Sequence, residues 1–349
     1  MLANVLKNDC ENIVSNLGWT KLRLFKNKNI LITGANGFIA RSLAYFFAYL
    51  NEKYSQNIKM TLVVRGSVPG DSIAKFIKKQ GGKFLRINLI KVFKLTPPID
   101  YVFHLAAVTS PKLISENPVY SLKINIQGTA NVLAAIKNKN VKKFLYFSSA
   151  AVYGSPDAAS IPTSENYNGN VSPVSFRSSY AEGKRAAEAL VVAYHRQFKI
   201  PVNIIRPANI YGPLMNFKQD NALNYFLNCV FRGKNPVLNT SGRSTRSFCY
   251  ISDAISVILL ACLCKNSGEV FNVGNEKAEI KIIDLAKLIG SVFDKKINVR
   301  VLGVNKIEFS KESIDRSVLS MKKVKKLLNF IPRINLEEGL GRLFRSRSE

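Results

Sequence analysis

A glycine-rich turn near the start of the chain constrains the fold more than any other feature. It is Gly34-Ala35-Asn36-Gly37-Phe38-Ile39-Ala40, between an apolar run at Asn29–Thr33 and a helical run at Arg41–Leu50. Glycines let the backbone approach a pyrophosphate, and the helix N-terminus offers amide donors and the positive end of a dipole. The small Ala40 still allows close packing of helix on strand. This order predicts a strand, a dinucleotide-binding turn and a helix.

Apolar runs alternate with helical runs beyond this turn. Further candidate strands are Met60–Val64, Lys83–Ile87, Tyr101–His104, Lys143–Ser148 and Val202–Arg206, and the main helical runs are Val119–Lys137 and Tyr180–Phe198. This alternation predicts an α/β fold with a doubly wound parallel sheet, a Rossmann fold, in which ligands bind beyond the carboxyl ends of the strands. After Gly212-Pro213 the pattern breaks into shorter pieces. We therefore expect a smaller C-terminal substrate-binding lobe.

These patterns divide the chain into three parts. Residues 1–28 are expected to form an N-terminal extension that packs on the rest. Residues 29–206 with about 250–274 are expected to form the dinucleotide-binding domain. Residues 207–249 with about 275–345 are expected to form the lobe that binds a nucleotide-linked sugar.

The composition is strongly basic, with 51 Lys and Arg against 23 Asp and Glu and a net charge of +28. Such a balance invites a nucleic-acid interpretation. The basic residues are spread along the chain, however, and neither a zinc-finger spacing nor a basic arm accompanies them. We interpret the charge as a solvated surface that would attract a phosphorylated substrate, and we expect no nucleic-acid partner.

The cysteines and apolar runs predict a cytoplasmic protein. Five cysteines form no CxxC pair: Cys10, Cys229, Cys249, Cys262 and Cys264. Their odd number and scatter indicate reduced thiols, and with only two histidines they give no metal site. No signal peptide is visible, and the runs Leu43–Leu50 and Ala254–Cys264 are too short to span a bilayer, so we expect no membrane association.

Tyr180 and Lys184 are the candidate reactive pair. A helix over Tyr180–Phe198 would place them one turn apart, with apolar residues on one side at Ala186, Ala187, Leu190, Val191 and Tyr194. A tyrosine titrates near pH ~10, and a neighbouring ammonium lowers that pKa. The spacing thus predicts a tyrosine that exchanges a proton with a hydroxyl or carbonyl. Such pairs are common by chance, so the surrounding motifs have to decide.

Several further motifs occur in a fixed order. They are His104-Leu105-Ala106-Ala107, Asn125-Ile126-Gln127-Gly128-Thr129, Ser148-Ser149-Ala150-Ala151-Val152-Tyr153-Gly154, Arg206-Pro207-Ala208-Asn209-Ile210-Tyr211-Gly212-Pro213 and Arg246-Ser247-Phe248-Cys249-Tyr250. Together with the glycine turn and the Tyr180–Lys184 pair, they resemble the extended short-chain dehydrogenase/reductase family. The branches that the chain resembles are the nucleotide-sugar epimerases and dehydratases, including UDP-xylose synthases and UDP-galactose 4-epimerases. The resemblance runs from about Lys28 to Arg342.

The resemblance implies a role for each matching residue. Ser149 would hydrogen-bond the sugar oxygen that is oxidised, Tyr180 would be the acid/base, and Lys184 would bind the nicotinamide ribose and lower the tyrosine pKa. Asn209, Arg246 and Arg316 would bind the substrate diphosphate, because a guanidinium fork suits phosphate oxygens. The implied cofactor contacts are Gly34, Asn36, Gly37, Phe38, Ile39, Arg65, Asn88, Leu105, Ala106, Ala107, Tyr180 and Lys184. The resemblance also leads us to expect a homodimer.

Ala150 and Ala151 depart from part of the family. Sugar 4,6-dehydratases carry Asp-Glu there and UDP-xylose synthases keep a glutamate, whereas alanine supplies no acid or base. We therefore expect a nucleotide-sugar 4-epimerase, with an NADPH-dependent 4-keto-sugar reductase as the alternative. A rival from another class is a non-enzymatic dinucleotide- or RNA-binding protein, which the intact Ser149, Tyr180 and Lys184 argue against.

The second strand is followed by Arg65. NAD-specific members have an acidic residue there that binds the adenosine ribose. Arg65 would face a 2′-phosphate and favour NADP, or it is an ordinary surface arginine. Asn88 replaces an aspartate that members often use near the adenine. The cofactor is therefore expected to be NAD or NADP, with Arg65 pointing to NADP.

Overall fold

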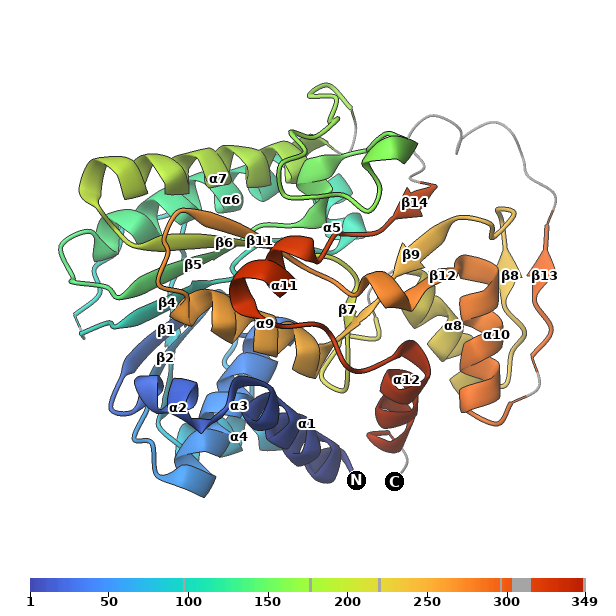
Figure 1. The fold of residues 1–349 in the computed structure, drawn as a ribbon, viewed down its shortest axis with the longest axis horizontal. Coiled ribbons are helices and arrows are strands. Elements are labelled where there is room, and N and C mark those ends of the chain that lie inside the picture. Colours follow the sequence, from blue (N-terminus) through green and yellow to red (C-terminus); the bar gives the residue numbers. More distant parts are fainter. Residues whose placement is uncertain (97, 176–177, 219–220, 296, 303–314, 348–349) are drawn as a thin grey trace.

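The computed structural model describes residues 1–96, 98–175, 178–218, 221–295, 297–302 and 315–347. Seven strands form one parallel sheet in the order β11-β6-β5-β4-β1-β2-β3 (Figure 1). They are β1 Asn29–Thr33, β2 Lys59–Val64, β3 Gly82–Arg86, β4 Tyr101–His104, β5 Lys143–Phe147, β6 Val202–Pro207 and β11 Glu269–Val273. The predicted doubly wound parallel sheet is confirmed, and β11 adds an edge strand beside β6.

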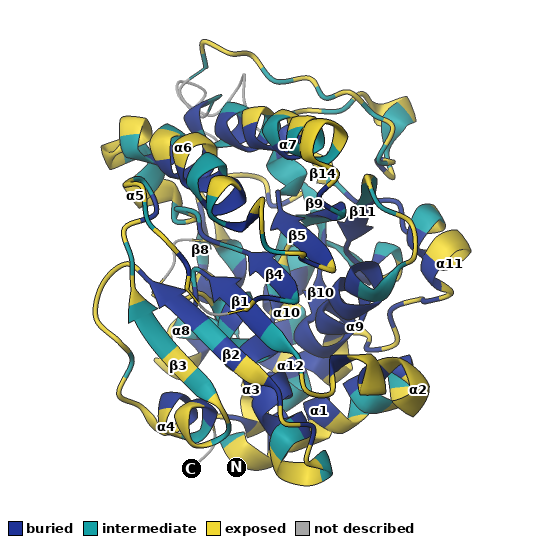
Figure 2. Cartoon of the chain, turned by 90° about the vertical axis from the view of Figure 1, so that its left-hand side faces the viewer, coloured by how far each residue is buried: buried dark blue, intermediate teal, exposed yellow. Residues whose placement is uncertain are grey.

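Alternate residues of the strands enter two different cores, because successive side chains of a strand point to opposite faces. Ile30 and Ile32 pack with α3 and α9, whereas Leu31 packs with α6 and α7. Figure 2 shows the central strands buried under both helix layers. The helices of these layers are α3 Phe38–Tyr54, α4 Ser72–Lys79, α5 Pro111–Glu116, α6 Pro118–Ile136, α7 Ser178–Phe198, α9 Ile251–Leu263 and α11 Lys322–Leu328.

Apart from α9, β11 and α11, the described chain after β6 forms short strands and helices beyond the carboxyl ends of the sheet. Three small sheets have the strand orders β12-β9-β14, β10-β7 and β13-β8. Their strands are β7 Ile210–Tyr211, β8 Val237–Leu238, β9 Thr245–Ser247, β10 Cys249–Tyr250, β12 Glu279–Lys281, β13 Arg300–Val301 and β14 Arg316–Ser317. The helices here are α8 Ala222–Phe231, α10 Ile282–Val292 and α12 Leu336–Arg345, with the 3-10 turn η4 at Glu276–Ala278. The 3-10 turns η2 Ala150–Tyr153 and η3 Ala158–Ser160 follow β5.

The N-terminal segment is helical and buried along one side. It contains α1 Leu2–Leu17, α2 Trp19–Leu22 and the 3-10 turn η1 Arg23–Phe25. The α1 side chains Leu6, Ile13 and Leu17 belong to the same core as α3 and α9. Asp9 of α1 accepts from Arg342 of α12 at 2.9 Å and from the Tyr250 hydroxyl at 2.9 Å. The first and last helices are therefore joined directly.

Two features are absent from the part of the chain that the structure describes. None of its helices combines the length and the apolar character needed to cross a bilayer. No three His, Cys, Asp or Glu side chains within the same ranges gather in a way that would hold a metal ion.

Candidate active site

The glycine turn lies against the loop that follows β4. Gly34 has φ of +69°, and a Cβ at this position would stand 2.9 Å from the Ala106 backbone nitrogen. Glycine tolerates both the left-handed backbone and this approach. Leu105, Ala106 and Ala107 leave β4 directly beside the turn. The two segments expected to bind the cofactor are therefore in contact.

The first turn of α3 presents unpaired amides. Gly37 is the N-cap, so no side chain caps the helix, and no acidic residue occurs in the first turn, which contains Phe38 and Ile39. The first amides of a helix have no intrahelical acceptor and carry partial positive charge. This 17-residue helix thus offers the donors and the charge that a pyrophosphate requires. The residues present fit a dinucleotide at this position.

The loop after β2 is tied to the same turn. Asn36 Nδ2 donates to the Ser67 carbonyl at 3.1 Å. The exposed Arg65 guanidinium lies 5.1 Å from the centre of the Tyr120 ring of α6. Asn88 follows β3, and its side chain accepts from the Ile90 amide at 3.2 Å. Arg65 and Asn36 thus share one end of the sheet, where the adenosine of a dinucleotide would lie.

His104 joins the carboxyl ends of β4 and β1. Its ring nitrogens lie 2.7 Å from Thr33 Oγ1 and 3.0 Å from Thr129 Oγ1. Burial, with a smaller effect of Lys184, lowers the pKa of His104 to about 3. The imidazole is neutral at physiological pH and acts as a fixed hydrogen-bonding link.

Tyr180 and Lys184 lie one turn apart on α7, as the spacing predicts. Burial raises the pKa of Tyr180, and a hydrogen bond with Ser149 partly opposes this rise. Lys184 is buried, and its Nζ donates to the Phe147 carbonyl at 2.6 Å. Burial lowers the pKa of Lys184 to about 7, which the charge of Glu188 partly opposes.

The prediction that Lys184 brings the pKa of Tyr180 below its usual value is therefore wrong for the protein alone. Desolvation penalises the phenolate more than the neighbouring groups stabilise it. The Lys184 amine is also directed to a β5 carbonyl and is only partly protonated near neutral pH. Tyr180 in this state is a protonated phenol.

A cleft of about 280 Å³ opens beside Ser149. Ser149 accepts from the Ala151 amide at 3.1 Å and so caps η2. The described lining contains no carboxylate; it consists of Ser149, Ala150, Ala151, Tyr153, Gly154, Pro156, Thr163, Pro207, Ala208, Asn209, Arg246, Arg316, Ser317, Val318 and Leu319. The residues expected to hold the diphosphate therefore share one cleft with Ser149.

Asn209, Arg246 and Arg316 reach this cleft from three segments. Asn209 Nδ2 donates to the Ser247 carbonyl at 3.0 Å, which links the end of β6 to β9. Arg246 donates to the Thr245 carbonyl at 2.7 Å, and burial lowers its pKa. Arg316 forms a two-point ion pair with Glu279, with Nε–Oε1 at 2.7 Å and Nη2–Oε2 at 2.9 Å. This part of the cleft presents two cations and an amide, a set suited to phosphate oxygens.

A family model described as "NAD dependent epimerase/dehydratase family" matches residues 30–274 of the chain. The chain belongs to this family. UDP-glucuronic acid decarboxylase 6 of Arabidopsis thaliana is 31% identical over 317 residues, covering 90% of this chain and 87% of the relative. UDP-glucuronic acid decarboxylase 1 of Xenopus tropicalis is 32% identical over 320 residues, covering 90% and 71%.

Solved structures of the family share the fold. UDP-glucose 4-epimerase of Thermotoga maritima aligns with a TM-score of 0.76 at 24% identity, covering 91% of this chain and 98% of that one. UDP-glucuronic acid 4-epimerase of Bacillus cereus, in complex with NAD, aligns with a TM-score of 0.72 at 24% identity, covering 91% and 96%. The protein is thus an enzyme of the NAD-dependent nucleotide-sugar epimerase/dehydratase family.

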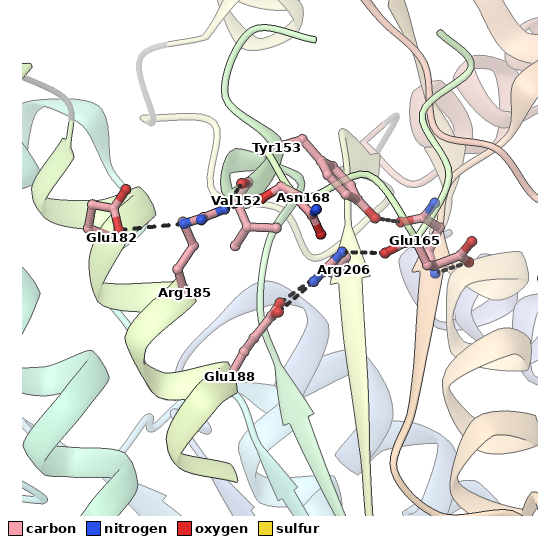
Figure 3. A network of polar contacts seen from close by, with 9 residues as sticks. Val152, Tyr153, Glu165, Asn168, Glu182, Arg185, Glu188 and Arg206 are labelled. Atoms are coloured by element: carbon pink, nitrogen blue, oxygen red, sulfur yellow. Dashed lines mark hydrogen bonds and ion pairs between the residues drawn. The ribbon is translucent and has the colours of Figure 1, made fainter. Parts of the chain in front are cut away.

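One network of this epimerase/dehydratase-family enzyme was not foreseen from the sequence (Figure 3). Glu188 of α7 pairs with Arg206 of β6, with Nε–Oε1 at 2.8 Å and Nη2–Oε2 at 2.6 Å. Arg206 also donates to the Glu165 carbonyl at 3.2 Å and lies 4.9 Å from the centre of the Tyr153 ring. The sequence signal that could have indicated this network is the four-residue spacing on α7, because Glu188 lies one helical turn after Lys184.

Arg185 connects α7 to the loops around the cleft (Figure 3). Its Nη1 donates to the Val152 carbonyl at 3.1 Å and to the Asn168 carbonyl at 2.6 Å. Gly169 has φ of +93°, and a Cβ there would stand 2.4 Å from both this Nη1 and the Val152 carbonyl oxygen. The helix that carries Tyr180 thus also positions the η2 turn that follows Ser149.

Proposed function

We propose that this enzyme oxidises and reduces C4 of a nucleotide-diphosphate sugar, and that it is a nucleotide-sugar 4-epimerase. The observation that carries the proposal is a cleft that is lined by Ser149, whose hydroxyl opposes the rise in the pKa of Tyr180, and that has no carboxyl group in its wall at Ala150 and Ala151. Ser149 and Tyr180 would form the proton-exchanging pair, and the described lining of the cleft offers no carboxyl group for acid/base chemistry at C5.

The chain's own residues supply the proton chemistry of this proposal. A dinucleotide held at the glycine turn and by Lys184 would supply the hydride acceptor and donor for C4. Ser149 orients the C4 oxygen, and Tyr180 exchanges a proton with it. Burial keeps Tyr180 in the protonated form, which is the form that can donate to the oxygen of a 4-ketone, a step common to epimerisation and ketone reduction. Asn209, Arg246 and Arg316 hold the diphosphate through charge-assisted hydrogen bonds.

The substitution Tyr180→Phe tests the proposal. We expect turnover to fall by ~10²–10⁴-fold, because one placed acid/base group is lost. Binding of dinucleotide and of nucleotide sugar, measured by calorimetry, should change little. Wild-type enzyme incubated with UDP-glucose or UDP-N-acetylglucosamine should give the 4-epimer, detected by chromatography and mass spectrometry.

The same assay contains the outcomes that would contradict the proposal. Full activity in Tyr180→Phe would remove Tyr180 from the mechanism. Rapid decarboxylation of UDP-glucuronate, or dehydration of a nucleotide-linked glucose, would show that another carboxyl group has replaced the one missing at Ala150 and Ala151.

A second candidate is an NADPH-dependent reductase of a nucleotide-linked 4-keto sugar. The observation that favours it is the exposed Arg65 at the adenosine end of the sheet, where a guanidinium would pair with a 2′-phosphate. Solvent weakens such a pair, so we expect a preference for NADP of roughly tenfold. Arg65→Asp should reverse it in titrations of both cofactors. If wild type binds NAD and NADP equally well, and Arg65→Asp leaves both affinities unchanged, Arg65 is an ordinary surface residue. The NAD-dependent 4-epimerase would then be the remaining candidate.

The domain division remains part of this proposal. The extension is residues 1–28, the dinucleotide-binding domain is 29–206 with about 250–274, and the substrate lobe is 207–249 with about 275–345. The strand β11 lies in the main sheet, which supports the inclusion of about 250–274 in the dinucleotide-binding domain. Residues 219–220, 296 and 303–314 of the lobe lie outside the described residues.

We also propose a cytoplasmic homodimer. The five cysteines are free thiols, which supports a reducing compartment. Helices α6 and α7 lie side by side and expose apolar side chains, among them Val119, Ile126 and Ala189, which support a self-association surface. Light scattering on the purified chain tests the stoichiometry.

A further inference from the structure

Glu279 lies behind the phosphate-binding side of the cleft, and nothing in its sequence context assigns it a role. We propose that Glu279 is a positioning residue that holds Arg316 in the orientation that binds the substrate diphosphate. This inference rests on the proposed function, because it takes the ligand of the cleft to be a nucleoside diphosphate linked to a sugar.

The three-stranded sheet β12-β9-β14 places the participating side chains. Thr245 of β9 pairs with Lys281 of β12 on one side and with Arg316 of β14 on the other. Glu279 stands two residues from Lys281, diagonal to Thr245, which is within reach of a long side chain. The Glu279 carboxylate therefore reaches across β9 and contacts the Arg316 side chain of β14.

Both oxygens of Glu279 are occupied. Oε1 accepts from Thr245 Oγ1 at 2.8 Å and from Arg316 Nε at 2.7 Å, while Oε2 accepts from Arg316 Nη2 at 2.9 Å. The hydrogen bond from Arg316 is the main cause that lowers the pKa of Glu279, so this carboxylate is ionised at neutral pH. A two-point pair of this kind fixes the plane of the guanidinium as well as its position.

The pair leaves donors of Arg316 for a ligand. A guanidinium has five N–H donors, and Glu279 accepts from one on Nε and one on Nη2. Within the described ranges, Nη1 has no protein acceptor, and Arg316 lines the cleft while it is paired. Thr245, the second partner of Glu279, precedes Arg246, which lines the same cleft. The Glu279 carboxylate thus links β9 and β14, the two strands that carry Arg246 and Arg316.

Arg246 brings a second guanidinium to the same cleft. It pairs across the sheet with Ser317, the neighbour of Arg316, and both arginines line the cleft. A diphosphate in the cleft would therefore meet cations from two adjacent strands.

The opposite role would be competition, in which Glu279 withdraws Arg316 and the substrate has to displace it. The two roles predict opposite effects of removing the carboxylate. Positioning predicts weaker diphosphate binding, whereas competition predicts tighter binding. The bond from Thr245 and the unused Nη1 favour positioning, since the pair fixes one edge of Arg316 and leaves the other edge available.

The test is calorimetric titration of UDP, GDP and TDP into wild type, Glu279→Gln and the control Asp284→Asn, each saturated with dinucleotide. Asp284 pairs with Lys287 on the exposed side of α10, so its variant loses the same charge at a position outside the described lining of the cleft. We expect the diphosphate that wild type binds to bind Glu279→Gln about tenfold more weakly. KM for the nucleotide sugar should rise by a similar factor and kcat should change less than about twofold, the pattern of lost ground-state binding.

The double variant Glu279→Gln with Arg316→Lys separates positioning from general damage. If Glu279 acts through Arg316, the double variant should bind UDP no more weakly than Arg316→Lys alone. Melting temperatures within about 2–4 °C of wild type would show that the variants fold. Additive losses in the double variant would overturn the inference.

The remaining outcomes distinguish the two proposals. Equal or tighter binding by Glu279→Gln, with wild type binding a nucleoside diphosphate, would overturn the positioning role and leave the proposed function intact. Failure of wild type to bind any of the three diphosphates would overturn the proposed substrate class, and the role of Glu279 would fall with it.

Discussion

Two arginines of this enzyme form similar two-point pairs with carboxylates in very different surroundings. The Arg206–Glu188 pair has side chains that are each 12% exposed, whereas Arg316 and Glu279 are 44% and 26% exposed. Arg206 also donates to the Glu165 carbonyl and lies over the Tyr153 ring. Arg316 has no further described protein partner and lines the cleft.

This difference in exposure shows that the geometry of an ion pair does not determine whether the pair serves stability or ligand binding. A buried pair that loses one member leaves an uncompensated charge in a poorly solvated place. An exposed pair loses little, because water replaces the missing partner. We therefore expect the Arg206–Glu188 pair to stabilise α7, the helix that carries Tyr180, and, on the proposed function, the Arg316–Glu279 pair to serve ligand binding.

Removal of the buried carboxylate should have the largest effect. Glu188→Ala leaves the Arg206 guanidinium without its anion, and we expect a loss of about 3–5 kcal/mol in the free energy of unfolding. The pKa of Lys184 should fall further, because the charge of Glu188 opposes the effect of burial. Urea unfolding followed by fluorescence measures the first effect.

The double variant Glu188→Leu with Arg206→Met is the matched control. It removes both charges and fills the space with apolar groups, so much of the stability should return. A loss below about 1 kcal/mol in Glu188→Ala alone would indicate that water reaches Arg206, and the contrast between the two pairs would disappear.

Breaking the exposed pair should change stability much less. We expect Glu279→Ala to lower the free energy of unfolding by less than about 1 kcal/mol, because both partners are solvated. The same urea experiment measures it, and 0.5 M salt should reduce the difference from wild type still further. A loss as large as that of Glu188→Ala would mean that Glu279 holds the lobe together instead of orienting a ligand.

The smallest expected effect is a pH dependence of the exposed pair. Arg316 lowers the pKa of Glu279, so the folded state binds this proton less readily than the unfolded chain does. The contribution of Glu279 is therefore complete above its ordinary pKa of 4.5 and is lost as the pH falls through the lower folded value. Stability differences between wild type and Glu279→Gln, measured from pH 3 to pH 7, should shrink at the acid end. A difference that grows there would contradict the sign.

The parts of the fold that follow from local chemistry were predictable. The glycine turn, the six strands from β1 to β6 and the helix carrying Tyr180 follow from turn chemistry and hydrophobic periodicity. The edge strand β11 was not among the predicted strands. Its five residues follow α9 and Gly268, and their pairing with β6 is what places them in the main sheet.

The burial of α7 illustrates what periodicity could not provide. The sequence suggested an apolar side containing Ala186, but Ala186 is exposed, whereas Lys184 and Glu188 are buried. Those charges are tolerated because the Phe147 carbonyl and the Arg206 guanidinium meet them from other strands. Such partners are distant in sequence, so neither the buried network nor the raised pKa of Tyr180 could be inferred from one helix.

The link between Asp9 and Arg342 has a consequence for how the chain matures. The two residues are 333 positions apart, so at ~5–20 residues per second roughly half a minute of translation separates them. For most of that time the apolar side of α1, with Leu6, Ile13 and Leu17, lacks α9, and throughout it lacks the complete α12. We therefore expect α1 to reach its final packing late, after α9 and α12 have both been synthesised.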